Sequence, residues 1–209
     1  PWPSQIQEVE IPSSEDATSQ KAYFYRTHQA VPQPLLVSLH SWSSDYRQKD
    51  PLIWQLLPKD WNYIHPDFGG PNVRPEACGS DLAISDIEDA ILYAMEHGNV
   101  NPREIHIIGS SGGGYATLMM YMKSKWKIKT YSAWVPISNL EDWYWETKSR
   151  KLKYAGHILA VTESQDSILQ VEEARRRSPF FQETPIERRT DAQLHIFCGI
   201  HDGYTGSVP

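Results

Sequence analysis

A serine with a glycine two positions before it and another two positions after it is the residue whose chemistry is easiest to define in this sequence. Residues 109–114 read GSSGGG, and Ser111 is the central serine of a G-x-S-x-G pattern. This pattern is typical of a sharp turn that exposes a nucleophilic hydroxyl, because side chains at the glycine positions would collide with neighbouring backbone. The amide that follows such a serine can stabilise an oxyanion. We therefore expect Ser111 to be a nucleophile and the Gly112 amide to be an oxyanion donor.

The segments on either side of Ser111 favour this interpretation. Residues 104–108 (EIHII) predict a strand, and residues 115–122 predict a helix that is apolar nearly all round, as a buried helix should be. A glycine-rich turn at a helix start can instead bind phosphate. That function would require G-x-G-x-x-G or G-x-x-x-x-G-K-S/T, and neither pattern is present.

A second oxyanion amide is expected from the loop after an earlier strand. Residues 35–39 (LLVSL) predict a short buried strand that leads directly into His40, Ser41 and Trp42. The backbone amide of Ser41 or of Trp42 is the candidate donor. His40 is expected to shape this loop and not to act as a catalyst.

The acid of a catalytic triad should follow a later strand. Residues 194–198 (LHIFC) predict such a strand, and Asp202 follows it in a turn between Gly199 and Gly203. Asp202 is therefore the expected acid. Asp142, which follows a predicted strand at residues 131–137, is the alternative.

The remaining segments indicate the fold that would position these residues. Residues 6–11 and 21–25 predict an antiparallel strand pair, and residues 81–97 predict a helix with Ser80 as its cap. Further strands and helices alternate at βαβ spacing, which predicts an α/β fold with a mainly parallel, doubly wound sheet. Chemistry in such sheets lies beyond the carboxyl ends of the strands. We expect one domain over residues 1–209, with a polar, helical, cap-like insertion at residues 139–190.

Taken in order, these stretches resemble the α/β-hydrolases of the prolyl-oligopeptidase-like type, a group of serine hydrolases that includes many carbohydrate esterases. The resemblance implies Ser111 as nucleophile, Asp202 as acid, the Trp42 and Gly112 amides as oxyanion hole, and no cofactor. The matching stretches are LLVSLHSW (35–42), the run from Asn101 to Glu104 into IHIIGSSGGGYA (105–116), RSPFF (177–181) and LHIFCGIHD (194–202).

The resemblance also implies a catalytic histidine one strand beyond the acid, and the sequence has none after Asp202. The final strand and final helix of the fold are likewise expected to be missing. We interpret the sequence as a truncated form of a longer enzyme and expect little or no turnover from it. Replacement by another histidine is the alternative: His65 and His157 lie in loop or inserted regions, and His201 adjoins Asp202.

A metal site is the other chemistry to consider near the predicted acid. His195, Cys198 and His201 have metal-binding side chains, and Asp202 could add a carboxylate. Side chains alternate along a strand, so His195 and Cys198 point to opposite faces. We therefore expect no metal, and we expect Cys78 and Cys198 to be separate thiols.

An aromatic cluster at the start of the insertion bears on the substrate. Trp143 and Trp145 adjoin two acidic residues. Aromatic faces stack on sugar rings or planar acyl groups, although both tryptophans could instead anchor the insertion. We expect a serine esterase that removes an acyl group, such as acetyl or feruloyl, from a carbohydrate. The alternatives are a prolyl-oligopeptidase-like peptidase and, because the histidine is missing, a noncatalytic binding module on a hydrolase scaffold.

Charge and composition exclude other classes. The net charge of −6 does not favour nucleic-acid binding, and we expect the basic runs at residues 123–129 and 175–177 to be solvated helix faces. Apolar stretches such as residues 116–122 are too short to cross a membrane. The first residue, Pro1, is not methionine, which favours a secreted or periplasmic protein over a cytoplasmic one. The oligomeric state is not indicated.

Overall fold

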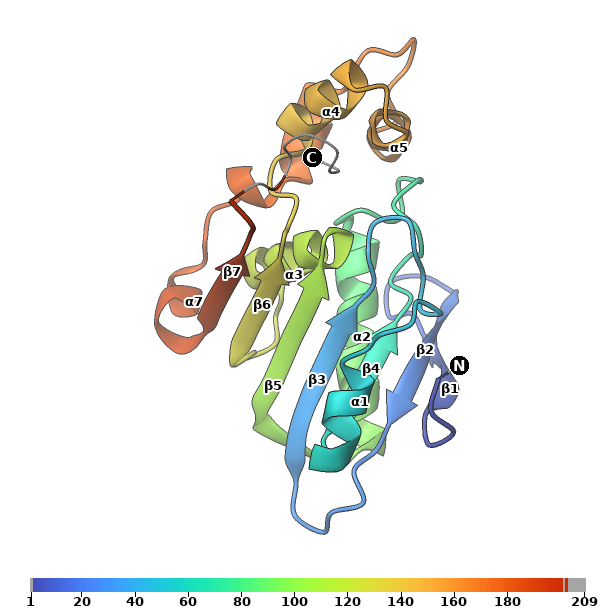
Figure 1. Ribbon diagram of the computed structural model, residues 1–209, viewed down its shortest axis with the longest axis vertical. Coiled ribbons are helices and arrows are strands. Elements are labelled where there is room, and N and C mark those ends of the chain that lie inside the picture. Colours follow the sequence, from blue (N-terminus) through green and yellow to red (C-terminus); the bar gives the residue numbers. More distant parts are fainter. Residues whose placement is uncertain (1, 201, 203–209) are drawn as a thin grey trace.

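The computed structural model describes residues 2–200 and residue 202. Its centre is a seven-stranded sheet with the order β1-β2-β4-β3-β5-β6-β7 (Figure 1). The strands are β1 (Gln7–Pro12), β2 (Ser19–Tyr25), β3 (Gln33–Leu39), β4 (Asn62–Pro66), β5 (Val100–Ser110), β6 (Thr130–Trp134) and β7 (Gln193–Phe197).

Strand direction follows the sequence prediction. β1 pairs with β2, and β2 with β4, in antiparallel fashion, whereas every later pairing, from β4 with β3 to β6 with β7, is parallel. The prediction of a mainly parallel sheet with N-terminal antiparallel strands is therefore confirmed. The carboxyl ends of β3, β5, β6 and β7 all meet at one edge of this sheet (Figure 1).

Helices cover the two faces of the sheet unequally. α2 and α3 lie on one face, and the short α1 lies on the other (Figure 1). The helices are α1 (Ile53–Leu56), α2 (Asp81–His97), α3 (Gly112–Lys123), α4 (Leu140–Ser149), α5 (Tyr154–Val161), α6 (Val171–Arg176) and α7 (Ile186–Asp191), with 3₁₀ turns η1 (Leu57–Lys59) and η2 (Pro179–Phe181).

The two best-defined helical predictions agree with the structure. α2 begins and ends where the sequence places it, because Ser80 Oγ accepts a hydrogen bond from the Ala83 amide at 3.0 Å and the chain turns extended at Gly98. α3 is buried on all sides, with Met119 and Met120 fully enclosed between the sheet and the neighbouring helices. A buried helix of this kind holds its first turn, which follows Ser111, in a fixed place.

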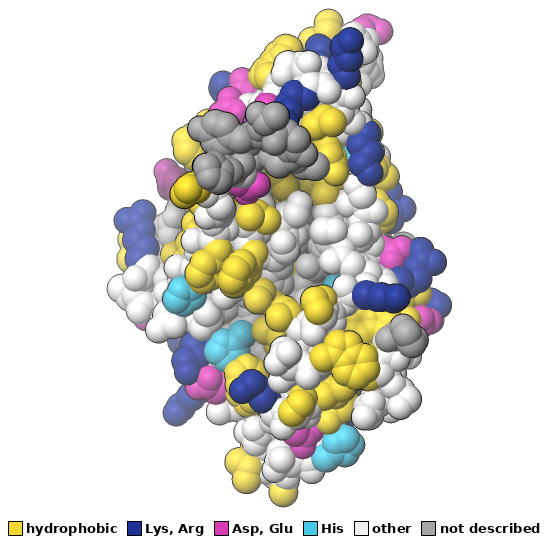
Figure 2. Space-filling view, viewed as in Figure 1, with side chains coloured by type: hydrophobic (Ala, Val, Ile, Leu, Met, Phe, Trp, Pro, Cys, Tyr) yellow, Lys and Arg dark blue, Asp and Glu magenta, His cyan; other side chains and the backbone are white. Residues whose placement is uncertain are grey.

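The face of the sheet opposite α2 and α3 carries exposed aromatic side chains beyond α1. Trp134 and Phe197 stack there with ring centroids 4.2 Å apart, although they are 46% and 41% exposed. Figure 2 looks onto this side of the molecule and shows hydrophobic side chains gathered over it.

Residues 139–190, which we call the insertion, connect β6 to β7. Their first helices, α4, α5 and α6, lie beyond the carboxyl ends of the parallel strands, and the chain then returns along the side of the sheet to β7 (Figure 1). The insertion is thus on the side of the sheet where we expect the chemistry.

Three local predictions were wrong. The strand predicted to reach Ile137 ends at Trp134, because Val135 adopts a positive φ of 41°. The basic run at residues 123–129 is not a helix face, because α3 ends at Lys123. Arg177 is not solvated but is 4% exposed, for reasons described with the site.

Two further sequence expectations concern thiols and membranes. Cys78 is buried and Cys198 exposed, and both are free, as predicted. Within the described ranges, no helix combines the length and the apolar character required to span a bilayer.

A buried carboxylate on α2 leads to a prediction for stability. Burial, reinforced by the charge of Asp89, raises the pKa of Asp86 from its ordinary value of 3.8 to about 6. The folded state therefore favours the protonated form, and this contribution to stability is lost as the pH rises through about 6. We expect wild type, compared with Asp86→Asn, to lose about 1 kcal/mol of unfolding free energy between pH 5 and pH 8. Urea unfolding at the two pH values measures this.

The control for this comparison is Asp81→Asn. Asp81 lies at the start of the same helix, but its side chain is 84% exposed. Its substitution should leave the pH dependence unchanged. A difference between wild type and Asp86→Asn that does not vary with pH would contradict the prediction.

Candidate active site

Ser111 occupies a strained turn between β5 and α3. Its backbone has φ 56° and ψ −116°, a conformation that residues other than glycine rarely adopt. Two hydrogen bonds fix the turn: the Ser111 amide donates to the Trp134 carbonyl at 2.8 Å, and the Tyr115 amide donates to the Ser111 carbonyl at 2.9 Å. The serine is therefore held at the carboxyl edge of the sheet, as the G-x-S-x-G pattern predicts.

Close backbone contacts explain the glycines that follow Ser111. A Cβ atom on Gly113 would overlap the carbonyl oxygen of Leu39, at the end of β3. A Cβ atom on Gly112 would overlap the amide nitrogen and Cα of Trp42. The start of α3 thus packs directly against the loop after β3, with no side chain between them.

This packing brings two candidate oxyanion donors together. The Gly112 amide lies in the first turn of α3, where backbone N–H groups have no partner within the helix, and the Trp42 amide is adjacent to it. The Ser41 amide, our other candidate, donates to Gln48 Oε1 at 2.8 Å. The Ser41 amide therefore already has an acceptor, which favours the Trp42 amide as the donor that acts with Gly112.

Substitution of Gly112 tests this arrangement. Gly112→Ala should push the Trp42 amide away from the first turn of α3 and so lower kcat for a chromogenic ester by about 10²–10³-fold, the usual loss for one oxyanion donor. Gly156→Ala is the matched control, because a Cβ atom at Gly156 meets nothing within 4 Å. Equal activity of the two variants would exclude Gly112 from the oxyanion hole.

Ser111 and Asp202 line one pocket of about 480 Å³ at the carboxyl edge of the sheet. The other walls come from the loop after β6 and from the start of the insertion, including Trp143 of α4. The structure therefore brings the predicted nucleophile and the predicted acid to a common cavity. The remaining lining residues are Val135, Pro136, Ile137, Ser138, Asn139, Asp142 and Glu146.

Asp142, the alternative acid, lines the same pocket from the first turn of α4. Its Oδ2 accepts a hydrogen bond from Asn139 Nδ2 at 2.7 Å, and its amide donates to Asn139 Oδ1 at 3.3 Å. Asp142 is thus part of the capping arrangement of α4. Asp202 follows β7 directly, which is the position that the fold assigns to the acid.

The two tryptophans of the aromatic cluster have different environments. Trp143 is buried between the rings of Trp42 and Tyr154, with centroid distances of 4.8 Å and 5.0 Å, and it also lines the pocket. Trp145 is 51% exposed and lies under the ammonium group of Lys148 at 5.0 Å. It does not line the pocket, and its role in substrate binding stays a prediction.

None of the histidines in the described part of the chain lines the pocket of Ser111. His65 is buried, its Nδ1–H donates to the Ser38 carbonyl at 2.8 Å, and burial lowers its pKa to about 4. His157 lies on α5, where burial also lowers its pKa. His201 lies outside the described residues.

His157 instead contacts the oxyanion loop. Its Nδ1 accepts a hydrogen bond from Trp42 Nε1 at 3.2 Å, across 115 residues of sequence. Trp42 thus packs its backbone against Gly112 and donates its indole N–H to the insertion. The aromatic contact of Trp42 with Trp143 reinforces this link. No sequence pattern indicated that contact, because the two partners lie in separate elements.

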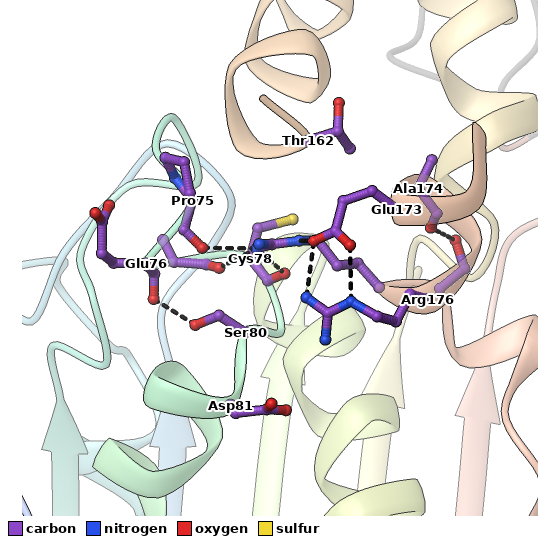
Figure 3. A network of polar contacts seen from close by, with 12 residues as sticks. Pro75, Glu76, Cys78, Ser80, Asp81, Thr162, Glu173, Ala174 and Arg176 are labelled. Carbon is purple, nitrogen blue, oxygen red and sulfur yellow. Dashed lines mark hydrogen bonds and ion pairs between the residues drawn. The ribbon is translucent and has the colours of Figure 1, made fainter. Parts of the chain in front are cut away.

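Arg177 forms the second link between the insertion and the body, and sequence reasoning missed it. Its Nε donates to Glu173 at 2.6 Å, and its Nη1 donates to the carbonyls of Pro75, Ala77 and Cys78 at 2.8–3.3 Å (Figure 3). These carbonyls belong to the loop that precedes α2. Hydrogen bonds from Arg176 and Arg177 lower the pKa of Glu173 to about 2.

The predicted absence of a metal concerned four residues near the acid. Of these, His195 stacks on Phe197, with ring centroids 6.2 Å apart. Among the residues that the structure describes, no three His, Cys, Asp or Glu side chains form a group able to hold a metal ion.

Comparison with known proteins decides the family. The model of the prolyl oligopeptidase family matches residues 80–204, which include the Ser111 turn, the insertion and Asp202. The chain belongs to the prolyl oligopeptidase family. This confirms the resemblance seen in the sequence. No curated protein sequence matches the chain.

Solved structures confirm the α/β-hydrolase fold of this family member. A puromycin-hydrolyzing peptidase of Mycobacterium tuberculosis has a TM-score of 0.76 and 17% identity, covering 99% of this chain and 32% of that one. An acylaminoacyl peptidase of Pyrococcus horikoshii has a TM-score of 0.70 and 16% identity, covering 92% and 36%. An esterase of Pyrococcus furiosus has a TM-score of 0.59 and 17% identity, covering 92% and 82%. The chain thus spans about a third of the length of the two peptidases.

Proposed function

We propose that this protein is a serine peptidase that cleaves an amide bond of a short peptide or aminoacyl compound through an acyl-enzyme. The observation that carries the proposal is the strained Ser111 turn, which is followed by Gly112 and packs through Gly112 against the backbone of Trp42. Stabilising such a backbone conformation costs free energy, and strain of this kind is concentrated at active sites.

Each group has a defined part in the proposed reaction. Ser111 Oγ attacks the carbonyl carbon while a general base takes its proton, and the Gly112 and Trp42 amides bind the resulting oxyanion. Collapse of the tetrahedral intermediate releases the amine and leaves an ester on Ser111, which water then hydrolyses. Asp202 has the part of the acid that orients the base.

Family membership supports an amide substrate over the carbohydrate ester that we expected from the sequence. Two of the three structures described above are peptidases, and the family whose model matches is that of prolyl oligopeptidase. An ester substrate is the second candidate, because the Pyrococcus furiosus esterase is the one of the three structures that this chain covers over most of its length, 82%. The strained backbone of Ser111 disfavours a noncatalytic module, because binding alone does not require a serine in this conformation.

Active-site labelling followed by a matched pair of substrates tests the proposal. A fluorophosphonate should label the protein once, on the tryptic peptide of residues 104–123, and fragmentation should place the label on Ser111 and not on Ser110. The same N-acylated amino acid, offered as a p-nitroanilide and as a p-nitrophenyl ester, then separates the candidates. Cleavage of both supports a peptidase, whereas cleavage of the ester alone supports the second candidate. Failure to label a protein that carries the catalytic histidine would overturn both.

A further inference from the structure

The side chain of Trp42 has one polar atom, and that atom contacts the insertion. Its Nε1–H donates to Nδ1 of His157, on α5, at 3.2 Å. Trp42 is only 2% exposed, so water cannot readily replace this acceptor. A buried indole N–H usually has a hydrogen-bond partner, and losing that partner costs free energy. The hydrogen bond to His157 therefore favours one position of the indole ring.

His157 is a well-placed acceptor because the helix that carries it is anchored. Ile158 and Val161, on the same helix, are fully buried in the main hydrophobic core. The imidazole ring also makes an edge contact with the ring of Tyr154, with centroids 5.8 Å apart. The packing of the insertion thus sets the position of His157.

The main chain of Trp42 belongs to the loop that packs against the start of α3. Its carbonyl accepts a hydrogen bond from the Asn72 amide at 2.9 Å, and its nitrogen and Cα lie against Gly112. The indole ring cannot rotate freely, because it packs against the rings of Tyr115 and Trp143. A displacement of this ring toward or away from α5 is therefore transmitted to the amide of the same residue.

The hydrogen bond also sets the protonation state of His157. An indole N–H can only donate, so Nδ1 must be the acceptor and the imidazole must be neutral, with its proton on Nε2. Burial, reinforced by the charge of Lys153 at the start of α5, lowers the pKa of His157 below its ordinary value of 6.5. In the described part of the chain, Lys153 is the charged group that acts on this ring, and the side chains that contact it, Trp42 and Tyr154, are aromatic. The bond is therefore present at neutral pH and is lost when acid adds a proton to Nδ1.

We propose that His157 is a positioning residue: its neutral imidazole holds Trp42, and through Trp42 the loop after β3, in the arrangement that binds the oxyanion. Among the described residues that line the pocket of Ser111, His157 is not included, so it acts through Trp42 and not on the substrate. The inference rests on the proposed function, because this loop binds an oxyanion only if Ser111 is the nucleophile. It goes beyond that function by making the insertion part of the catalytic arrangement and by making that arrangement depend on one proton.

The indole N–H signal of Trp42 in a proton–nitrogen correlation spectrum tests the link without any turnover. The signal is assigned by its absence in Trp42→Phe. Between pH 8 and pH 5 we expect it to move upfield as the hydrogen bond is lost, with the same midpoint, below 6.5, as the imidazole signals of His157. An indole signal of Trp42 that does not follow the titration of His157 in folded protein would overturn the inference.

Three variants separate the hydrogen bond from other effects of pH. His157→Asn keeps an acceptor oxygen that cannot be protonated in this range, so the Trp42 signal should stay at its neutral-pH position throughout. His157→Leu removes the acceptor and should give the low-pH position of the signal at every pH. His97→Asn is the matched control, because His97 lies exposed at the end of α2 and should leave the titration of the Trp42 signal unchanged.

The same variants should change kcat and not KM in an enzyme that carries the catalytic histidine. We expect His157→Leu to lower kcat for a chromogenic substrate about tenfold, with KM nearly unchanged, because a displaced oxyanion donor weakens binding of the transition state more than binding of the substrate. His157→Asn should recover most of this loss, and His97→Asn should keep the wild-type kcat. A wild-type kcat in folded His157→Leu would overturn the positioning role.

Failure of the inference and failure of the proposed function give different results. Fluorophosphonate labelling of Ser111, together with a Trp42 signal that does not respond to His157, would remove the positioning role and leave the hydrolase. A Trp42 signal that titrates with His157, in protein that carries the catalytic histidine but is not labelled, would remove the hydrolase and with it the role of His157 in the reaction.

Discussion

In an enzyme whose catalytic histidine is in place, replacing Ser111 with alanine is expected to lower kcat/KM by about 10³–10⁶-fold for whichever chromogenic substrate is cleaved. The loss is large because the proposed acyl-enzyme forms on Ser111. Residual activity would come from the Gly112 and Trp42 amides, which can still polarise a bound carbonyl. Initial rates with the p-nitroanilide and the p-nitrophenyl ester measure the effect.

Ser110→Ala is the matched control for this experiment. Ser110 is the preceding residue at the end of β5, and it does not line the pocket of Ser111. The control should keep wild-type rates, and both variants should unfold at wild-type denaturant concentrations. If Ser111→Ala retained more than a tenth of the activity, Ser111 would not be the nucleophile.

The largest expected effect on stability comes from Arg177→Met. The substitution keeps an unbranched apolar stem but leaves the carbonyls of Pro75, Ala77 and Cys78 without their buried donor. Removing one partner of a buried, hydrogen-bonded charge typically costs 3–5 kcal/mol. Glu173 keeps its bidentate pair with Arg176, so we expect a loss of about 3 kcal/mol in the free energy of unfolding.

Arg175→Met provides the comparison. Arg175 lies two residues before Arg177, on α6, and pairs with Glu141, but its side chain is 44% exposed. Surface pairs contribute about 0–1 kcal/mol, so this variant should remain close to wild type. Denaturant unfolding measures the free energy of unfolding of both variants. Equal losses of this free energy in Arg177→Met and Arg175→Met would show that the buried contacts of Arg177 do not hold the insertion to the body.

Sequence predicted the parts of the fold whose signals are local. α2 was found to the residue because its cap, its apolar spacing and its terminal glycine all lie within one segment. β5 was predicted only from Glu104, whereas it begins at Val100, because Pro102 and the polar residues around it hide the start of the strand. The first turn of α3 was hidden for a related reason, since its glycines resemble a loop.

The sequence predicted those site residues whose chemistry requires a fixed spacing along the chain. It did not predict contacts between site residues and partners that lie far away in the sequence. Ser111 and Gly112 follow from the glycine pattern. The choice between Ser41 and Trp42 required the Gln48 hydrogen bond, which no motif encodes. The difference between Trp143 and Trp145 was accessible in principle, because residues two apart point to opposite sides of a helix.

Trp42 belongs to two parts of the molecule at once. Its main chain packs against Gly112 at the start of α3, and its indole N–H is bound by His157 in the insertion. The insertion is therefore not a freely exchangeable module. An engineer who grafts a different one onto this body, to change its specificity, would also have to supply an acceptor for that indole. Without one, the graft would disturb the catalytic loop that it was meant to leave alone.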